Sequence, residues 1–332
     1  MTLYVHGFGH FHPENEITNR LLEDLDIGTD DAWILERVGI RSRRTVLDLD
    51  YVRTTRNADV RASAEASLWS NAEMAERAAR LALARAGIGP EQVGLLFSGS
   101  NAPEVACPAE ACTVARRLGL SAPALDLNSA CSSFLAGVAC LEWMRPEALP
   151  DFVLLVAVES LTRTVDYSDR STAVLFGDGA AAAVLSPRLP APARLIDPQL
   201  RSDPSGADKV VVPRTGHVRQ DGRAVQWFAI KRTQEGYEAV RDAHGDPRRD
   251  LHLVGHQANL RVLEQVCQRC DIPPERHHAN VELRGNTGAA SCPSVVSMRW
   301  EKWGPRDDVA LVTVGGGLSW GRCLLRFEEL PR

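Results

Sequence analysis

Short apolar runs alternate with amphipathic segments along the chain, and this pattern predicts an α/β protein. Residues 71–87 carry apolar side chains at helical spacing and end on Gly87, a residue suited to a helix C-cap. Residues 108–119 repeat this design between a proline and a glycine, and a third helix is predicted from Cys131 to about Arg145. The runs typical of buried strands in this half are residues 2–9, 93–100, 124–130 and 152–160.

The second half of the chain repeats this order without repeating the residues. Strands are predicted at 251–256, 309–314 and 323–329, and helices at 259–270 and 286–303. Such a recurrence favours two related α/β halves, 1–186 and 187–332, that pack together as layers.

Two stretches depart from the rhythm of strands and helices. Residues 42–70 are rich in Arg and Asp and have no clear period, and residues 187–226 are rich in Pro, Asp and Gly. We expect both to be elaborations on the surface of the scaffold.

Composition and charge exclude several classes of function. The chain has 332 residues, is 44% hydrophobic and 24% charged, and carries a net charge of −5 without a dense Lys/Arg block. This argues against nucleic acid as a partner, although an acidic carrier protein could dock on a few arginines. No apolar run is long enough to span a membrane, and the first residues do not resemble a secretory signal. The eight cysteines are therefore expected to be reduced thiols in a cytoplasmic enzyme.

The strongest local motif is the segment 126–143, DLNSACSSFLAGVACLEW. It predicts a strand that leads through small residues into an apolar helix, with the thiol of Cys131 at the helix N-terminus. Free N–H groups and the helix dipole would favour a thiolate there. The alternative is a buried core cysteine, as Cys140 is expected to be, and the motif alone leaves both interpretations open.

Three further positions are candidates for a catalytic role, and each also has a purely structural explanation. His256 ends a predicted strand, where α/β proteins often place their sites, although a lone histidine can equally be structural. Asn286 is expected to begin a helix, which it could simply cap. The glycines around Gly316 follow a strand, and their N–H groups could face a developing oxyanion or lie in a turn.

Taken together, these motifs resemble the β-ketoacyl-acyl-carrier-protein synthase III family of the thiolase superfamily. The resemblance covers nearly the whole chain and implies a thiolase-like layered αβαβα fold. The signatures that match in order are DDAWILERVGIRSRR (30–44), LFGDGAAAAVL (175–185), GHQANLR (255–261), GNTGAAS (285–291) and GGGLSWG (315–321).

The resemblance implies a Claisen-type condensation with Cys131 as nucleophile, completed by His256 and Asn286. It places the oxyanion hole at the backbone N–H groups of Cys131 and Gly316. Substrates would arrive on coenzyme A or on the phosphopantetheine of an acyl carrier protein, in a homodimer without metal or redox cofactor. The substrate-binding positions implied by the family are Thr29, Trp33, Arg37, Asn259 and Arg261.

Departures from the family pattern concern the choice of substrate. Cys107 stands where an acetyl-using member has a bulky aromatic residue that reaches across the dimer, and the smaller side chain frees roughly 100 Å³. We therefore expect an acyl chain longer than acetyl. Residues 42–70 exceed the family norm by about twenty residues, and Lys231 or Arg232 could replace an absent docking lysine. Glu104 is a candidate extra base, although a solvated loop glutamate is the simpler explanation.

These departures favour a specialised pathway, such as a stand-alone ketosynthase that joins two carrier-bound polyketide chains into an α-pyrone. Two alternatives stay open: an acyltransferase that moves the acyl group to oxygen or nitrogen, and a housekeeping enzyme that initiates fatty-acid synthesis. A serine hydrolase is disfavoured because no G-x-S-x-G elbow occurs. A zinc site is disfavoured because no second pair stands at finger spacing from its possible ligands, Cys267, Cys270, His277 and His278.

Overall fold

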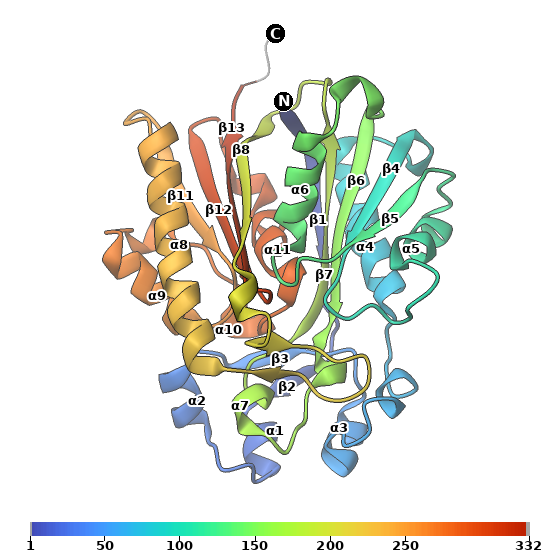
Figure 1. Cartoon of the computed structure of the whole chain (residues 1–332), viewed down its shortest axis with the longest axis vertical. Helices are drawn as coiled ribbons and strands as arrows, with labels where there is room; N and C mark the ends of the chain where they lie inside the picture. Colours follow the sequence, from blue (N-terminus) through green and yellow to red (C-terminus); the bar gives the residue numbers. More distant parts are fainter. Residues whose placement is uncertain (1, 330–332) are drawn as a thin grey trace.

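Nine strands form one mixed sheet that runs through both halves of the protein, as the computed structural model shows for residues 2–329 (Figure 1). The strand order is β11-β12-β13-β8-β1-β7-β6-β4-β5. The strands of the first half are β1 (Leu3–Phe11), β4 (Val93–Gly99), β5 (Ala124–Leu127), β6 (Phe152–Ser160) and β7 (Asp178–Ser186). Those of the second half are β8 (Ala193–Ser202), β11 (Asp250–Gly255), β12 (Asp307–Gly315) and β13 (Ser319–Phe327).

Two short hairpins and a set of helices surround this sheet. The hairpins pair β2 (Glu16–Thr18) with β3 (Ser42–Arg44) and β9 (Val210–Val211) with β10 (Arg219–Gln220). The helices of the first half are α1 (Asn19–Asp24), α2 (Asp31–Arg37), α3 (Leu49–Thr55), α4 (Asn71–Ala86), α5 (Glu110–Leu118), α6 (Ser133–Trp143) and α7 (Arg170–Ala173). Those of the second half are α8 (Gly222–His244), α9 (Leu260–Arg269), α10 (Val281–Arg284) and α11 (Ser291–Met298).

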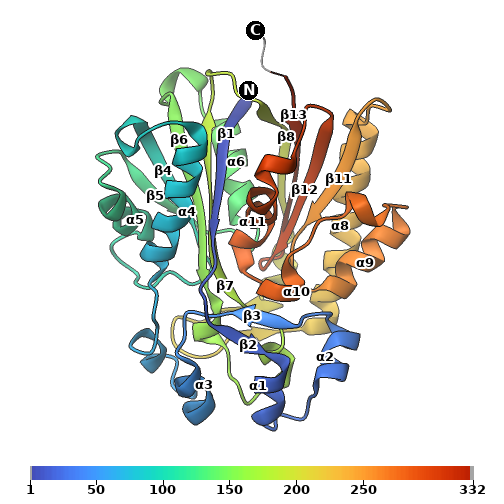
Figure 2. The same cartoon turned by 180° about the vertical axis from the view of Figure 1, so that it is seen from behind.

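Alternate residues of the central strands face two different cores. In β6, Leu155 packs toward α6 and α11, whereas Leu154 packs toward α4. In β12, Leu311 faces the same α6–α11 core and Val312 faces α8 and α9. Because side chains alternate along a strand, each half of the sheet is covered on both faces. The result is five layers, with α6 and α11 in the middle (Figures 1 and 2).

The two halves are joined through β1 and β8. β1 pairs antiparallel with β7 along its length and with β8 over Leu3–Val5 only. The expected boundary at 186/187 falls in the connection between β7 and β8. The division into two halves with these limits stays a prediction.

The local signals for helix ends are confirmed where they are strongest. Ser70 and Glu73 form a capping box at the start of α4, and Gly87 ends that helix in a left-handed conformation. Gly119 ends α5 in the same way. The predicted helix from Cys131 begins only at Ser133.

Three expectations from the sequence are wrong, two about irregular segments and one about a helix. Residues 42–70 contain β3 and α3, and their Val46 and Leu47 are fully buried, so part of this stretch belongs to the core. Arg43 is also fully buried and donates through Nε to the Val174 carbonyl at 2.9 Å. Within 187–226, β8 is a central strand of the sheet. The segment 286–303 is not one helix: α11 lies between two 3₁₀ turns, Gly288–Ala290 and Trp300–Lys302, and Gly288 has a positive φ of 53°.

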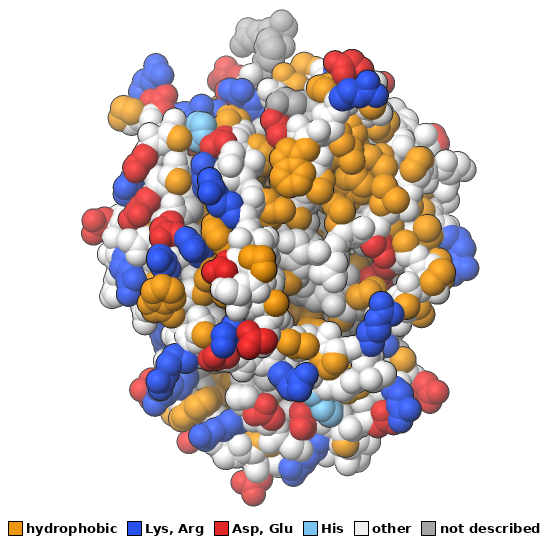
Figure 3. Space-filling model, viewed as in Figure 1, with side chains coloured by type: hydrophobic (Ala, Val, Ile, Leu, Met, Phe, Trp, Pro, Cys, Tyr) orange, Lys and Arg blue, Asp and Glu red, His pale blue; other side chains and the backbone are white. Residues whose placement is uncertain are grey.

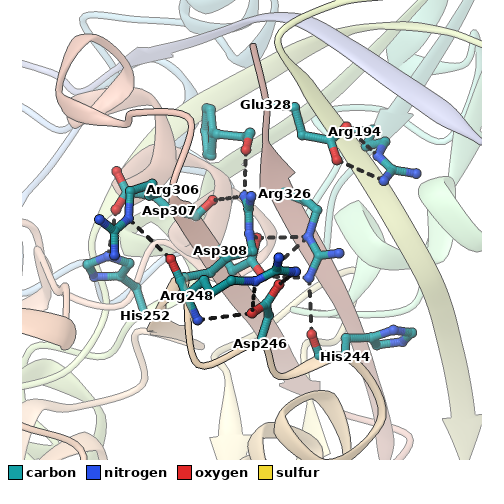
Figure 4. Close-up of polar contacts among 12 residues, drawn as sticks. Arg194, His244, Asp246, Arg248, His252, Arg306, Asp307, Asp308, Arg326 and Glu328 are labelled. Atoms are coloured by element: carbon teal, nitrogen blue, oxygen red, sulfur yellow. Dashed lines mark hydrogen bonds and ion pairs between the residues drawn. The ribbon is translucent and has the colours of Figure 1, made fainter.

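A network of ion pairs and hydrogen bonds lies at the end of the sheet where β11 and β12 begin (Figure 4). This end is opposite Gly255 and Gly315, at which these two strands finish. Buried Asp308 accepts from Arg249 Nε at 2.8 Å and from Arg326 Nη2 at 2.6 Å. These bonds connect the start of β12 to β13 and to the loop before β11, and two guanidinium groups compensate the one buried carboxylate.

Within residues 2–329, no helix is both long and apolar enough to cross a membrane. The same residues include no group of three or more His, Cys, Asp or Glu side chains placed to hold a metal ion. The cysteines and histidines of the zinc alternative are engaged elsewhere in part: Cys270 is in the α8–α9 core, and His278 Nε2 lies 3.0 Å from His252 Nδ1.

The contact of β1 with α4 gives a direct test of this packing. A Cβ added to Gly9 would lie 1.9 Å from the Ala78 carbonyl oxygen and 2.6 Å from the Ala82 nitrogen. We expect Gly9→Ala to lower the free energy of unfolding by about 1–3 kcal/mol or more, because backbone cannot move aside cheaply. Urea denaturation followed by circular dichroism measures this change.

Gly304→Ala is the matched control, because a Cβ there would touch only Asp307 Oδ2 at an ordinary 3.8 Å. That variant should keep or slightly raise the stability. Equal stability of the two variants would contradict the close approach of β1 and α4.

Candidate active site

Cys131 lies in a tight turn between β5 and α6, held against the second half of the protein. Ala130 has a left-handed φ of 50°, a conformation that persists only where neighbouring contacts hold it. Those contacts include Ser132 Oγ, which lies 2.9 Å from Ser129 Oγ and 2.7 Å from Ser319 Oγ at the start of β13. A Cβ on Gly315 would lie 2.9 Å from the Cys131 nitrogen, so the end of β12 abuts the same turn.

The thiol of Cys131 is protonated at neutral pH, which corrects the expectation of a thiolate. Burial raises the pKa of this thiol to about 12, and the carboxyl of Glu159, whose own pKa burial raises to about 8, adds to the rise. Cys131 precedes α6 by two residues instead of beginning it. The helix N-terminus therefore does not outweigh the cost of a buried negative charge.

His256 follows the last residue of β11 and is also uncharged. Its backbone N–H donates to the Val312 carbonyl at 2.8 Å, which continues the parallel pairing with β12. Its Nδ1 lies 2.9 Å from Ser291 Oγ on α11, so Nε2 is the nitrogen left for a ligand. Burial lowers the pKa of His256 to about 4, and the ring stays neutral at physiological pH.

Asn286 lies in the loop between α10 and α11, with its backbone bonded on both sides. Its N–H donates to the Leu175 carbonyl at 2.9 Å, and its own carbonyl accepts from Gly177 at 3.0 Å. The side-chain Oδ1 accepts from the Gly288 nitrogen at 3.0 Å. With Oδ1 engaged, the Nδ2 group is the part of the amide available to a ligand.

One cavity of about 260 Å³ brings these three side chains together. It is lined by residues of both halves, among them Cys131, His256, Asn286 and Gly316. Three expected substrate-binding residues, Trp33, Arg37 and Asn259, line it as well. Asn259 also caps α9, where its Oδ1 accepts from the Val262 nitrogen at 2.8 Å.

Three other expected residues lie outside the cavity within one protomer. Arg261 Nη2 donates to the Leu35 carbonyl at 2.6 Å, which ties α9 to α2. Thr29 Oγ1 is buried without a hydrogen-bond partner in residues 2–329. Cys107 is exposed on the loop that follows β4.

Glu104, the candidate extra base, is engaged by the first half of the chain. Its Oε1 lies 3.0 Å from Arg163 Nη1 and accepts from the Asn71 nitrogen at 3.1 Å. It does not line the cavity within one protomer, and its catalytic role stays a prediction.

Arg170 is a cavity residue that the sequence did not reveal. Its guanidinium carbon lies 5.0 Å from the centre of the Trp33 ring, and both residues line the cavity. The two positions are far apart in the sequence and meet only through the packing of α2 and α7. A cation above an aromatic ring provides a flat, positively charged surface suited to a nucleotide base or phosphate.

Comparisons with known proteins place this geometry in a family. Residues 125–204 match the family model described as 3-oxoacyl-[acyl-carrier-protein] synthase III, and residues 245–327 match its C-terminal model. The chain is 34% identical over 338 residues to beta-ketoacyl-[acyl-carrier-protein] synthase III of Sinorhizobium medicae, covering 97% of this chain and 98% of the relative.

Solved structures agree with the sequence matches. The 3-oxoacyl-[acyl-carrier-protein] synthase III of Aquifex aeolicus superposes with a TM-score of 0.86 at 29% identity, covering 98% of this chain and 100% of that one. The priming β-ketosynthase of the R1128 polyketide pathway gives 0.82 at 26% identity, with 99% and 97% covered. These findings confirm the predicted family and the predicted thiolase-like fold.

The raised pKa of the buried thiol predicts an unusual reactivity profile. Because iodoacetamide reacts with thiolate, the alkylation rate of Cys131 should rise about tenfold per pH unit from pH 7 to about 10 without levelling off. A short cysteine peptide, whose thiol has a pKa of about 8.5, should level off within this range. Peptide mass spectrometry separates Cys131 from the other cysteines, and a plateau for Cys131 below pH 9 would contradict the assignment.

Proposed function

The chain belongs to the 3-oxoacyl-[acyl-carrier-protein] synthase III family of condensing enzymes, and we propose that it joins an acyl group held on Cys131 to a second thioester. The observation that supports this most strongly is that Cys131, His256 and Asn286 line one cavity together. A thiol and two neutral hydrogen-bonding side chains are the groups that such a two-step condensation needs.

In the first step, the Cys131 sulfur attacks the carbonyl carbon of an acyl thioester. The bond to the carrier sulfur breaks, the acyl group stays on Cys131, and the thiol proton leaves with the carrier as its new thiol. The N–H groups of Cys131 and Gly316 are proposed to stabilise the oxyanion of the tetrahedral intermediate. Splitting the condensation in this way replaces one difficult step by two easier ones.

In the second step, a malonyl-type extender loses carbon dioxide to form an enolate. A proton on His256 Nε2 and the Nδ2 group of Asn286 donate hydrogen bonds to its thioester oxygen. The enolate carbon then attacks the acyl carbonyl, and the Cys131 sulfur leaves as a thiolate, which takes a proton from water. Neutral donors suit this step because a carboxylate at either position would repel the enolate.

The outer part of the cavity suits a coenzyme A or carrier arm. Trp33 and Arg170 are proposed to hold the nucleotide end together with Arg37 and Thr29, and Asn259 to contact the pantetheine. Arg261 lies on the same side of the fold, through its bond to the Leu35 carbonyl, and would contribute to carrier docking. No metal or redox cofactor enters either step. The proposed partners are an acyl carrier protein or acyl-CoA. We also propose that the enzyme acts in the cytoplasm.

A homodimer is proposed because the outer edge of β5, the last strand in the order, has an apolar character. Leu125 of β5 is 51% exposed, Val105 on the loop after β4 is 50% exposed, and Trp143 at the end of α6 is 67% exposed. Figure 3 shows an apolar area on this side of the molecule. Pairing with a second copy would cover these side chains.

Within such a dimer, Cys107 would reach the acyl site of the partner subunit and leave room for a chain longer than acetyl. A larger acyl site would suit a specialised pathway, such as one that joins two carrier-bound polyketide chains into an α-pyrone. Transfer of the acyl group to oxygen or nitrogen is the second candidate. The retained Asn286, which serves the enolate, favours carbon–carbon bond formation over it.

Active-site variants separate the two steps. Cys131→Ala should never gain acyl mass from an acyl-CoA, whereas Asn286→Ala should load normally and lose condensation by a factor of about 100–1,000, the usual effect of removing one oxyanion donor. Intact-protein mass spectrometry measures loading, and chromatography measures the 3-oxoacyl product. Asn15→Ala, an asparagine that bonds the Leu47 carbonyl outside the cavity, is the control. Condensation by Asn286→Ala at the normal rate would contradict the proposed role.

The acyl-length hypothesis has its own test in competition assays. Wild-type protein should load octanoyl-CoA in preference to acetyl-CoA. Cys107→Phe should shift the loading ratio toward acetyl by about tenfold or more, because each methylene that an apolar pocket can no longer accept changes the specificity by about tenfold or more. Cys112→Phe places the same ring at the other exposed cysteine of this region and should leave the ratio unchanged. A strong acetyl preference in the wild type would overturn the hypothesis.

A further inference from the structure

The loop after β4 brings a second amide against the reacting sulfur. Asn101 Nδ2 lies 3.5 Å from Cys131 Sγ, within hydrogen-bonding distance for sulfur. The backbone N–H of Asn101 donates to both carboxylate oxygens of Glu159, at 3.1 and 3.0 Å. This paired contact fixes the loop at the point where its side chain meets the sulfur.

Glu159 connects Asn101 to the segment that follows Asn286. Glu159 is fully buried in β6, and its Oε1 also accepts from the Ala289 nitrogen at 3.1 Å. A Cβ on Gly288 would lie 2.7 Å from that oxygen and 2.8 Å from Asn101 Nδ2. One carboxyl group therefore positions both loops, and the packing leaves the Asn101 amide little room to turn away from the sulfur.

Asn101 approaches the sulfur from a side that the cavity does not use. Although it contacts Cys131 Sγ, Asn101 is not among the residues that line the cavity. The cavity has to admit the arm of the second substrate while the first acyl group is still on Cys131. The acyl group is therefore expected to lie on the other side of the sulfur, toward Asn101.

The remaining atom of the amide indicates what this acyl group carries. Asn101 Oδ1 is buried and has no hydrogen-bond partner within residues 2–329. A buried acceptor left unpaired is costly, and a hydroxyl or amide N–H two or three atoms along the acyl chain would satisfy it. We propose that Asn101 is a further active-site residue, which donates to the Cys131 sulfur and selects acyl groups bearing a hydrogen-bond donor near the thioester.

This inference rests on the proposed acylation of Cys131, and a competition between two acyl donors tests it. Wild-type protein offered 3-hydroxybutyryl-CoA and butyryl-CoA should load the hydroxylated chain at least about tenfold faster, because a site built for a hydroxyl rejects the analogue without it. Asn101→Leu keeps the size of the side chain and removes its polar atoms, so the preference should disappear. Asn15→Ala should keep it. Equal loading by the wild type, or an unchanged ratio in Asn101→Leu, would overturn the proposal.

A second measurement examines the contact with sulfur without any acyl donor. At pH 8, iodoacetamide should alkylate Cys131 about three- to tenfold more slowly in Asn101→Ala, because losing a donor to the thiolate raises the thiol pKa by up to about one unit. Asn101→Asp, which places a carboxyl group beside the sulfur, should react more slowly still. A merely structural role would not order the variants in this way at equal thermal stability.

Equal alkylation rates in all three proteins would overturn the proposed contact. If no acyl donor loads Cys131 in any variant, the proposed function fails, and the alkylation series still decides whether Asn101 touches the thiolate.

Discussion

The position of the Cys131 thiol, at the seam between the two halves, constrains the rest of the site. The turn that carries Cys131 comes from the first half, whereas Ser319 and the end of β12 come from the second and hold it in place. Cys131 is half-buried there and lines the cavity between the two halves. The reactivity of the site is consequently set by burial more than by any neighbouring charge.

Burial also explains why the three proposed catalytic side chains are neutral. The thiol keeps its proton, the pKa of His256 is lowered to about 4, and Asn286 cannot ionise. Isolated charges in such surroundings would be expensive in the resting protein. Negative charge then arises only on the reacting oxygen, where fixed N–H donors are already in place and need not reorganise.

Much of the fold and the core of the site were predictable because their signals are local. His256 and the glycines near Gly316 stand at strand ends, and Gly87 and Gly119 mark helix ends by residue type alone. The protonation state of Cys131 was not predictable, because it depends on burial by distant segments. Arg170 and Asn101 acquire their roles only when loops far apart in the sequence meet. The prediction that residues 42–70 form a surface elaboration was wrong for the same reason. An arginine such as Arg43 is expected at the surface, and its burial depends on a carbonyl partner far away in the sequence.

The central claim is that Cys131 holds the first acyl group while the second substrate enters the cavity. A single-turnover experiment on isolated acyl-enzyme tests it most directly. Acyl-enzyme freed of donor is mixed with one equivalent of ¹³C-labelled malonyl-acyl carrier protein, and intact mass spectrometry follows both proteins. The account predicts that the acyl mass leaves Cys131 at the same rate as a labelled 3-oxoacyl chain appears on the carrier. Release of the acyl group as free acid, or its transfer without gain of labelled carbon, would contradict it.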